Sequence, residues 1–333
     1  MYFLTIFLLK CNFLSGRIVD FYLTKYYNHR LAGLLYLLAL DSYKDNSGVC
    51  IPKFVELFKL YSCYRGKRVI CDKKRNTCGF SILINKFTKK IIISLSGTVG
   101  ILQQFREGTS LLKKLKDFHG MGLVNNYFAE IHEYLWKNIK DVFDEPHYKN
   151  FKVIVTGHSL GGAMAALIGL RIQFEEIRKS SDIFLYTFGE PRVGTHTFAI
   201  HFDKRVPNCW RVVYATDFVA HIPSCKKVRP TRLKLSRKRV NLPCDPHSLN
   251  GYYHHGTEVW YPNTKTFRNF YRICLGYPRN EDFNCSDHVN FRIHKYSYHR
   301  GHHSQYFLDL YKTYPHIFKA NYDKTCKIYN KME

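Results

Sequence analysis

The sequence predicts an α/β protein, in which a mostly parallel central sheet carries helices on both faces. Runs rich in apolar and β-branched residues, such as 183–188, are typical of strands buried in a parallel sheet. The stretch 122–143 repeats apolar residues every three or four positions, as an amphipathic helix does. Such segments alternate along the chain, which favours parallel strands joined by helices. We expect strands at 68–71, 80–85, 90–96, 151–156, 183–188, 210–214 and 258–261, and helices at 31–40, 122–143, 160–178 and from 307–311 onward.

The chain of 333 residues, with 45% hydrophobic and 23% charged residues, has the composition of a globular protein. Tyr2–Leu9 is apolar and is followed by Ser15-Gly16, which resembles a signal peptide with its cleavage point. The alternative is a buried N-terminal strand. We therefore expect a signal peptide over 1–16, one domain over 17–333 and a secreted protein. No run reaches the ~20 apolar residues that span a bilayer.

The chain is strongly basic, with 51 Lys and Arg against 26 Asp and Glu and a net charge of +25. A solvated cationic surface explains this charge, and transient attraction to a lipid–water interface or an anionic membrane surface is the sharper alternative. No nucleic-acid recognition motif accompanies the charge, so we expect no nucleic-acid partner. Eight of the basic residues and no acids lie in 226–239, which we expect to be an exposed loop held between Cys225 and Cys244.

Eleven cysteines are spread over the chain without Cys-x-x-Cys pairs, which argues against a structural zinc site. With the apolar N-terminus they suggest disulfides and an oxidising compartment. Cys71 and Cys78 lie at the two ends of a turn and are expected to pair. Local pairing also suggests the bridges Cys225–Cys244 and Cys274–Cys285, with Cys50, Cys63, Cys209 and Cys326 left unassigned.

Ser159 lies in Gly157-His158-Ser159-Leu160-Gly161, between an apolar strand and an Ala-rich helix. This context is that of the nucleophile elbow of the α/β-hydrolase fold. The turn from strand to helix is sharp and strained, so the residues two before and two after the nucleophile must be small. Gly157 and Gly161 meet this demand. The Leu160 N–H lies at the helix start, where it can stabilise an oxyanion. The alternative is an ordinary serine in a glycine-rich turn.

A nucleophilic serine needs a base and an orienting acid, and in this fold the order along the chain is Ser, then Asp or Glu, then His. Asp217 follows the expected strand 210–214 closely and is therefore the favoured acid. The residues alone do not select the base among the clustered histidines His288, His294, His299, His302 and His303.

Over about residues 20–310 the chain resembles the class 3, or fungal-lipase-like, lipases, and among them especially a secreted nematode branch. The resemblance rests on motifs in a fixed order, at 94–98, 155–163, 188–194, 211–223, 254–261, 285–287 and 303–307. It implies Asp217 and His303 as the partners of Ser159. It also implies that Thr98 supplies an oxyanion hydroxyl and N–H beside the Leu160 N–H, and that 99–112 occupies the position of a lid.

Three positions depart from the family pattern. Ser96 replaces the usual Arg before Gly-Thr, His302 replaces the acid before the last histidine of the triad, and Ala220 replaces a Pro. The changes at Ser96 and His302 are expected to alter the anchoring of the loop and the orientation of His303.

The sequence thus predicts a serine ester hydrolase that acts on lipid esters like a triacylglycerol lipase, through a Ser-Asp-His triad and an acyl-enzyme, without cofactor or metal. Two other ester substrates stay open, those of a phospholipase A1 and of a soluble-ester esterase. A third alternative is a catalytically inactive hydrolase fold that binds lipid or a partner, and a fourth is a basic binding protein that acts through 226–239. The sequence does not predict the oligomeric state.

Overall fold

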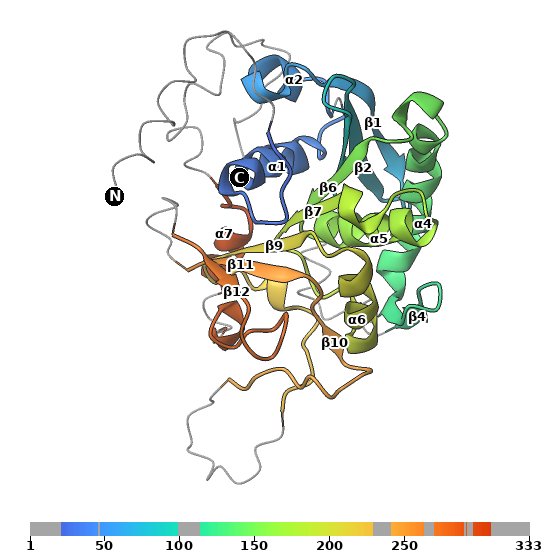
Figure 1. Ribbon diagram of the computed structural model, residues 1–333. Coiled ribbons are helices and arrows are strands. Elements are labelled where there is room, and N and C mark those ends of the chain that lie inside the picture. The colour runs from blue at the N-terminus through green and yellow to red at the C-terminus, as the bar shows by residue number, and fades with distance from the viewer. Residues whose placement is uncertain are drawn as a thin grey trace, which may run out of the picture.

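An eight-stranded sheet forms the centre of the molecule, as the computed structural model shows (Figure 1). The structure describes residues 21–45, 47–98, 114–228, 241–262, 270–289, 291 and 296–307. The strand order is β1-β2-β3-β6-β7-β9-β11-β12. The neighbours from β3 to β11 run parallel, whereas β1, β2 and β12 are added antiparallel at the edges. The strand bounds are Ser62–Ile70 (β1), Thr77–Asn85 (β2), Lys90–Leu95 (β3), Lys152–His158 (β6), Ile183–Phe188 (β7), Cys209–Tyr214 (β9), Thr257–Tyr261 (β11) and Arg272–Cys274 (β12).

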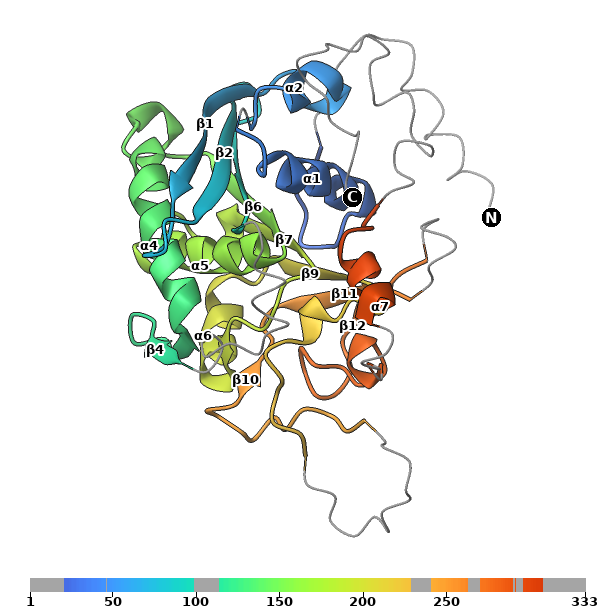
Figure 2. The same cartoon turned by 180° about the vertical axis from the view of Figure 1, so that it is seen from behind.

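Helices cover both faces of this sheet, which confirms the predicted fold class. Helix α1 lies against one face, and α4 and α5 lie against the other (Figures 1 and 2). In β3 the side chains of Ile91 and Ile93 join the core beneath α4 and α5, while that of Ile92 joins the core beneath α1. This alternation is the two-residue period of a strand buried on both sides. The helix bounds are His29–Asp41 (α1), Ile51–Phe54 (α2), Asn126–Ile139 (α4), Leu160–Phe174 (α5), His196–Arg205 (α6) and Tyr296–His303 (α7).

A small second sheet, of order β10-β8-β5-β4, was not predicted. Its strands are only two or three residues long, too short for a hydrophobic period: Leu115–Asp117 (β4), Leu123–Asn125 (β5), Gly194–Thr195 (β8) and Tyr252–Tyr253 (β10).

Several predicted boundaries were wrong. The helix expected at 122–143 begins only at Asn126, because the Asn125 side chain accepts the Phe128 N–H and caps the first turn. The helix expected to reach 178 ends at Phe174. Strand β1 begins at Ser62 rather than at 68. The prediction missed its first half because an edge strand is only half buried, and its polar residues interrupt the apolar pattern. The expected helix from Phe307 onward lies outside the described residues except for Phe307 itself, which is in a turn.

Disulfides join Cys71 to Cys78, Cys225 to Cys244 and Cys274 to Cys285, so the three predicted bridges are confirmed. Cys50 is also disulfide-bonded. Cys63 and Cys209 are free thiols. Among the described residues, two groups could offer metal ligands: Cys225/Cys244/Asp287 and Glu258/Cys274/Cys285. Each contains a disulfide, so its sulfur atoms are not available as thiolates.

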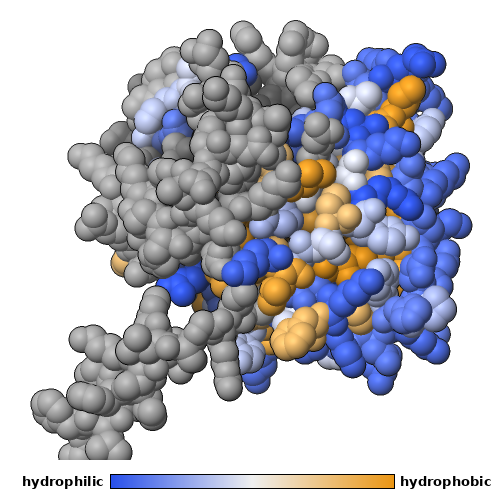
Figure 3. Space-filling view, turned by 90° about the horizontal axis from the view of Figure 1, so that it is seen from above, coloured by the Kyte–Doolittle hydropathy of each residue, from blue (hydrophilic) through white to orange (hydrophobic). Residues whose placement is uncertain are grey.

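None of the helices that the structure describes is long and apolar enough to cross a bilayer. Seen from above, the described surface has mostly hydrophilic side chains on the right, and hydrophobic side chains gather toward the middle of the view (Figure 3). The expected signal peptide, the 99–112 segment and most of the basic segment 226–239 lie outside the described residues.

Candidate active site

Ser159 lies between the end of β6 and the start of α5 with a left-handed backbone, φ 58° and ψ −130°. A non-glycine residue rarely adopts this conformation, and it is the strained turn that a nucleophile elbow requires. The Ser159 N–H donates to the carbonyl of Phe188 at the end of β7, at 2.9 Å, which fixes the turn to the neighbouring strand.

The two glycines around Ser159 allow backbones to approach closely. A Cβ on Gly157 would lie 2.1 Å from the Gly161 carbonyl oxygen, and a Cβ on Gly161 would lie 2.2 Å from the Leu95 carbonyl oxygen. Neither approach leaves room for a side chain. Both predicted elbow positions therefore require glycine, for the steric reason that the motif suggested.

Asp217 and His303, predicted as the acid and the base, are hydrogen-bonded to each other. The distance between His303 Nδ1 and Asp217 Oδ2 is 2.8 Å, although the residues are 86 positions apart. Asp217 follows β9 in a turn, and His303 is the last residue of α7, which lies beside the ends of β9 and β11 (Figure 2). Both side chains are buried.

Asp217 is fixed by two further donors. The Tyr306 hydroxyl donates to Oδ2 at 2.6 Å, and the Val219 N–H donates to Oδ1 at 2.9 Å. Burial alone would raise the pKa of Asp217, but His303, Tyr306 and Val219 together hold this pKa below its ordinary value. Asp217 is therefore a carboxylate at neutral pH. It accepts the His303 Nδ1–H, which leaves Nε2 of a neutral imidazole without a proton, as a general base requires.

The buried polar atoms without a hydrogen-bond partner among the described residues include Ser159 Oγ and His303 Nε2. Their residues are held close together through His158. The His158 Nε2 lies 2.7 Å from the His303 carbonyl oxygen, and the two imidazole centroids are 4.5 Å apart. An unsatisfied buried hydroxyl and imidazole carry an energetic cost, which is typical of groups kept ready for a reaction.

The two predicted oxyanion residues lie at the ends of neighbouring parallel strands. Leu95 of β3 is in register with Gly157 of β6, so the segment that leads to Thr98 emerges beside the elbow. A Cβ on Gly97 would lie 2.4 Å from Leu160 Cβ, which shows how closely the two segments pack. The Leu160 N–H belongs to the first turn of α5, where a helix leaves its N–H groups without intrahelical partners.

Ser96 anchors its loop despite the departure from the family pattern. Its Oγ donates to the Ser42 carbonyl at 2.9 Å and accepts the Gly79 N–H at 2.9 Å, so it ties the end of α1 to β2. His302 anchors the turn that carries Asp217 in a similar way, with its Nδ1 2.8 Å from Thr216 Oγ1. Burial lowers the pKa of His302, which favours its neutral form.

Three residues at this site were not singled out from the sequence, although each lies in one of the quoted motifs. Tyr306 donates to Asp217. A Cβ on Gly189, at φ 56°, would lie 2.6 Å from Asp217 Oδ2 and 2.8 Å from His303 Nδ1, so only glycine leaves space for the pair. His158 holds the His303 backbone. Burial and the nearby His303 lower the pKa of His158 to about 3, so it stays neutral.

The α/β-hydrolase fold, with a serine at its elbow and a buried Asp–His pair beside it, defines the class of this protein as a carboxylic ester hydrolase. The family model of Lipase (class 3) matches residues 92–227. Lipase ZK262.3 of Caenorhabditis elegans is 38% identical over 267 residues, which cover 80% of this chain and 75% of that protein. The chain belongs to the class 3 lipase family.

Two further comparisons agree with this assignment. The secreted mono- and diacylglycerol lipase 1 of Fusarium solani is 31% identical over 148 residues, which cover 44% of this chain and 43% of that protein. A crystal structure of the lipase from Rhizopus microsporus var. chinensis superimposes with a TM-score of 0.62 at 22% identity, covering 84% of this chain and 86% of that one. This structural likeness bears on the fold alone.

Proposed function

We propose that the protein hydrolyses carboxylic esters of glycerolipids, with Ser159 as nucleophile, His303 as general base and Asp217 as the orienting acid. His303 Nε2 takes the proton of Ser159 Oγ as the oxygen attacks the ester carbonyl, and Asp217 stabilises the imidazolium that forms. His303 then returns the proton to the leaving alcohol. Water, activated by the same imidazole, hydrolyses the acyl-enzyme and restores Ser159.

The negative oxygen of each tetrahedral intermediate is stabilised by the Leu160 N–H and by the hydroxyl and N–H of Thr98. Donors of this kind contribute about 3–4 kcal/mol each to transition-state stabilisation. The position of both residues beside the elbow supports these roles. The triad and the oxyanion donors account for ester hydrolysis without a metal or an organic cofactor.

One observation carries the proposal. Ser159 has a strained backbone and a buried hydroxyl without a partner among the described residues, while a buried carboxylate holds the neighbouring His303 so that its Nε2 is an acceptor. A strained backbone and an unsatisfied buried hydroxyl both destabilise the fold, and a serine with a purely structural role would need neither. The alternative of an inactive binding fold lacks a comparable observation.

Labelling by a fluorophosphonate probe tests the proposed site directly. We expect stoichiometric modification of the purified protein at Ser159, because the probe reacts only with a serine that a base activates. Peptide mapping by mass spectrometry identifies the modified residue. Protein that is not labelled, or is labelled elsewhere, would contradict the assignment. A parallel comparison of triacylglycerol emulsion, phospholipid vesicles and a short soluble ester then separates lipase, phospholipase A1 and esterase activity.

We further propose that the chain is secreted, with 1–16 as its signal peptide and 17–333 as the mature domain. Disulfides at Cys71–Cys78, Cys225–Cys244 and Cys274–Cys285 support an oxidising compartment. The basic surface supports transient contact with an anionic lipid interface.

Secretion predicts a glycan on Asn284, in the sequon Asn284-Cys285-Ser286. Asn284 is exposed in a turn beside the Cys274–Cys285 disulfide. Protein expressed with its N-terminus in animal cells and recovered from the medium should become lighter on digestion with an N-glycosidase. The Asn284→Gln variant should lack this change in mass. Retention of the full chain inside the cells without a glycan would contradict the proposed localisation.

A further inference from the structure

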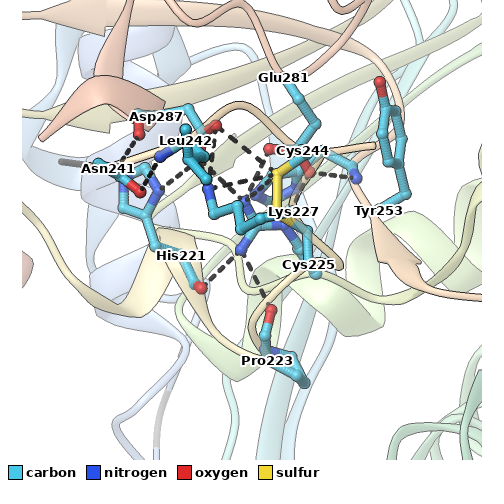
Figure 4. Close-up of a disulfide and its surroundings, with 12 residues drawn as sticks. His221, Pro223, Cys225, Lys227, Asn241, Leu242, Cys244, Tyr253, Glu281 and Asp287 are labelled. Carbon is cyan, nitrogen blue, oxygen red and sulfur yellow. Dashed lines mark hydrogen bonds and ion pairs between the residues drawn. A yellow bond between two sulfur atoms is a disulfide. The ribbon is translucent and has the colours of Figure 1, made fainter. Parts of the chain in front are cut away.

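A buried cluster of charged side chains lies directly behind the turn that carries Asp217. At its centre is Arg192, 1% exposed, which forms a two-pronged ion pair with Glu281: Nε to Oε1 and Nη2 to Oε2, both at 2.7 Å. Asp287 Oδ1 lies 3.3 Å from Arg192 Nη2 and 3.2 Å from Lys227 Nζ. The Cys225–Cys244 disulfide lies beside Lys227 and Asp287, and the carbonyl groups of His221 and Pro223 point into the cluster (Figure 4).

Arg192 and His254 donate hydrogen bonds to four consecutive backbone carbonyl groups of one short segment, 220–223. Arg192 Nη1 donates to the carbonyls of His221, at 2.6 Å, and Pro223, at 3.1 Å. The Arg192 backbone N–H donates to the Ile222 carbonyl at 2.9 Å. The Ala220 carbonyl is bound by His254 Nε2 at 2.6 Å.

The segment 220–223 is continuous with the residues that orient the acid. Val219, the residue before it, donates its N–H to Asp217 Oδ1, and Asp217 Oδ2 faces His303. Glu281 also links Arg192 to His254, because the Oε1 atom that pairs with Arg192 also accepts the His254 backbone N–H, at 2.8 Å. Arg192, Glu281 and His254 therefore form one rigid support, and displacement of the segment would move the Val219 N–H away from Asp217.

We propose that Arg192 is a positioning residue for the triad: with Glu281 and His254 it clamps the segment 220–223 and thereby fixes the Asp217 carboxylate against His303. This role rests on the proposed function of Asp217. Only the forked guanidinium can satisfy Glu281 on one side and two backbone carbonyls on the other, since an ammonium group lacks this fixed fork. Burial alone would lower the pKa of Arg192, but Glu281 and Asp287 hold this pKa above its ordinary value, so the charge is retained.

Arg192→Lys keeps a positive charge and loses the fork. We expect kcat to fall about 10- to 100-fold, the effect of a misplacement of about 1 Å in a catalytic group. KM should change little, because Arg192 is buried and acts on the triad only through the segment 220–223. Rates are expressed per active site titrated with the fluorophosphonate probe, so that unfolded protein does not count.

Arg178→Lys is the matched control. Arg178 is also buried and donates to backbone carbonyls, those of Phe151 at 2.8 Å, Ile177 at 2.7 Å and Tyr148. It lies beside the start of β6, whereas Ser159 follows the end of that strand. Its replacement should lower the melting temperature without changing kcat per titrated site. Equal kcat values in Arg192→Lys and the wild type, or an equal loss in both variants, would overturn the positioning role.

His254 gives a second measurement if Arg192→Lys does not fold. His254→Phe removes the donor to Ala220 and should lower kcat about fivefold. His254→Gln places an amide N–H near the position of Nε2 and should restore most of the rate. If both variants retain the full kcat, the clamp is refuted. Failure of the wild-type protein to react with the probe would instead refute the proposed function, and the role of Arg192 with it.

Discussion

Replacement of Ser159 by Ala is expected to abolish ester hydrolysis, with kcat lowered on the order of 10⁶-fold. The substitution removes the oxygen that forms the acyl-enzyme, and no other group at the elbow can replace it. The fold should tolerate the change. In the described part of the chain the Ser159 hydroxyl has no hydrogen-bond partner to lose, and Ala at φ 58° is no more strained than Ser. We therefore expect a melting temperature equal to that of the wild type or slightly higher.

The measurement is the hydrolysis of a short nitrophenyl ester and of a triacylglycerol emulsion by purified protein. Ser94→Ala is a matched control, because the Ser94 hydroxyl in β3 is also buried without a partner among the described residues. This control should keep its full activity. Substantial hydrolysis by Ser159→Ala would show that another residue is the nucleophile.

Replacement of Asp217 by Asn is expected to lower kcat about 10⁴-fold, the effect of an imidazole held in the wrong tautomer. The structure explains why an amide cannot replace this carboxylate. Oδ2 faces the His303 Nδ1–H and the Tyr306 hydroxyl, and Oδ1 faces the Val219 N–H. An asparagine offers a carbonyl oxygen to only one of these sides. If its NH₂ group faces His303, Nδ1 must accept, and Nε2 then carries the proton and cannot act as a base.

Asp282→Asn is the matched control for this change. Asp282 is likewise buried and accepts the backbone N–H groups of Gly276, at 2.8 Å, and Asn284, at 3.0 Å, but it has no contact with the triad. We expect it to affect stability and to leave kcat unchanged. A rate for Asp217→Asn within tenfold of the wild type would contradict the role assigned to Asp217.

The same carboxylate has a predicted effect on stability as a function of pH. The pKa of Asp217 is below its ordinary value of 3.8 in the folded protein. Its contribution to the free energy of unfolding is therefore fully present above about pH 5. That contribution is lost as the pH falls below about 4 and through the folded pKa. Urea unfolding of the wild type and Asp217→Asn, followed by circular dichroism from pH 3 to 7, should show the difference between them shrinking at acidic pH.

The extent to which sequence alone predicts this protein depends on how local each feature is. The elbow could be read from five consecutive residues, because the strain at Ser159 and the small size of its neighbours are properties of one turn. The buried strands could be read from their apolar runs. Strand β1, half-buried at the sheet edge, could be read only in part, since its polar residues carry no clear period.

The disulfide pairing followed from short separations of 7, 19 and 11 residues. The base of the triad did not follow from the residues alone, because several histidines crowd the C-terminal region. Family motifs selected His303. In the structure, α7 brings it to Asp217 across 86 positions of the chain.

The sequence alone predicted the fold class and the chemistry of an ester hydrolase, which are confirmed, and it pointed to Ser159 as the proposed nucleophile. These features depend on local pattern and residue type. The way in which the triad is supported is visible only in the folded protein. Ser96 replaces a family arginine yet still anchors its loop, because α1 and β2 meet at its hydroxyl. Tyr306, Gly189 and Arg192 act on Asp217 through contacts between segments far apart in the chain. No sequence period encodes such contacts, because they arise only when the carboxyl ends of parallel strands are brought to one edge of the sheet.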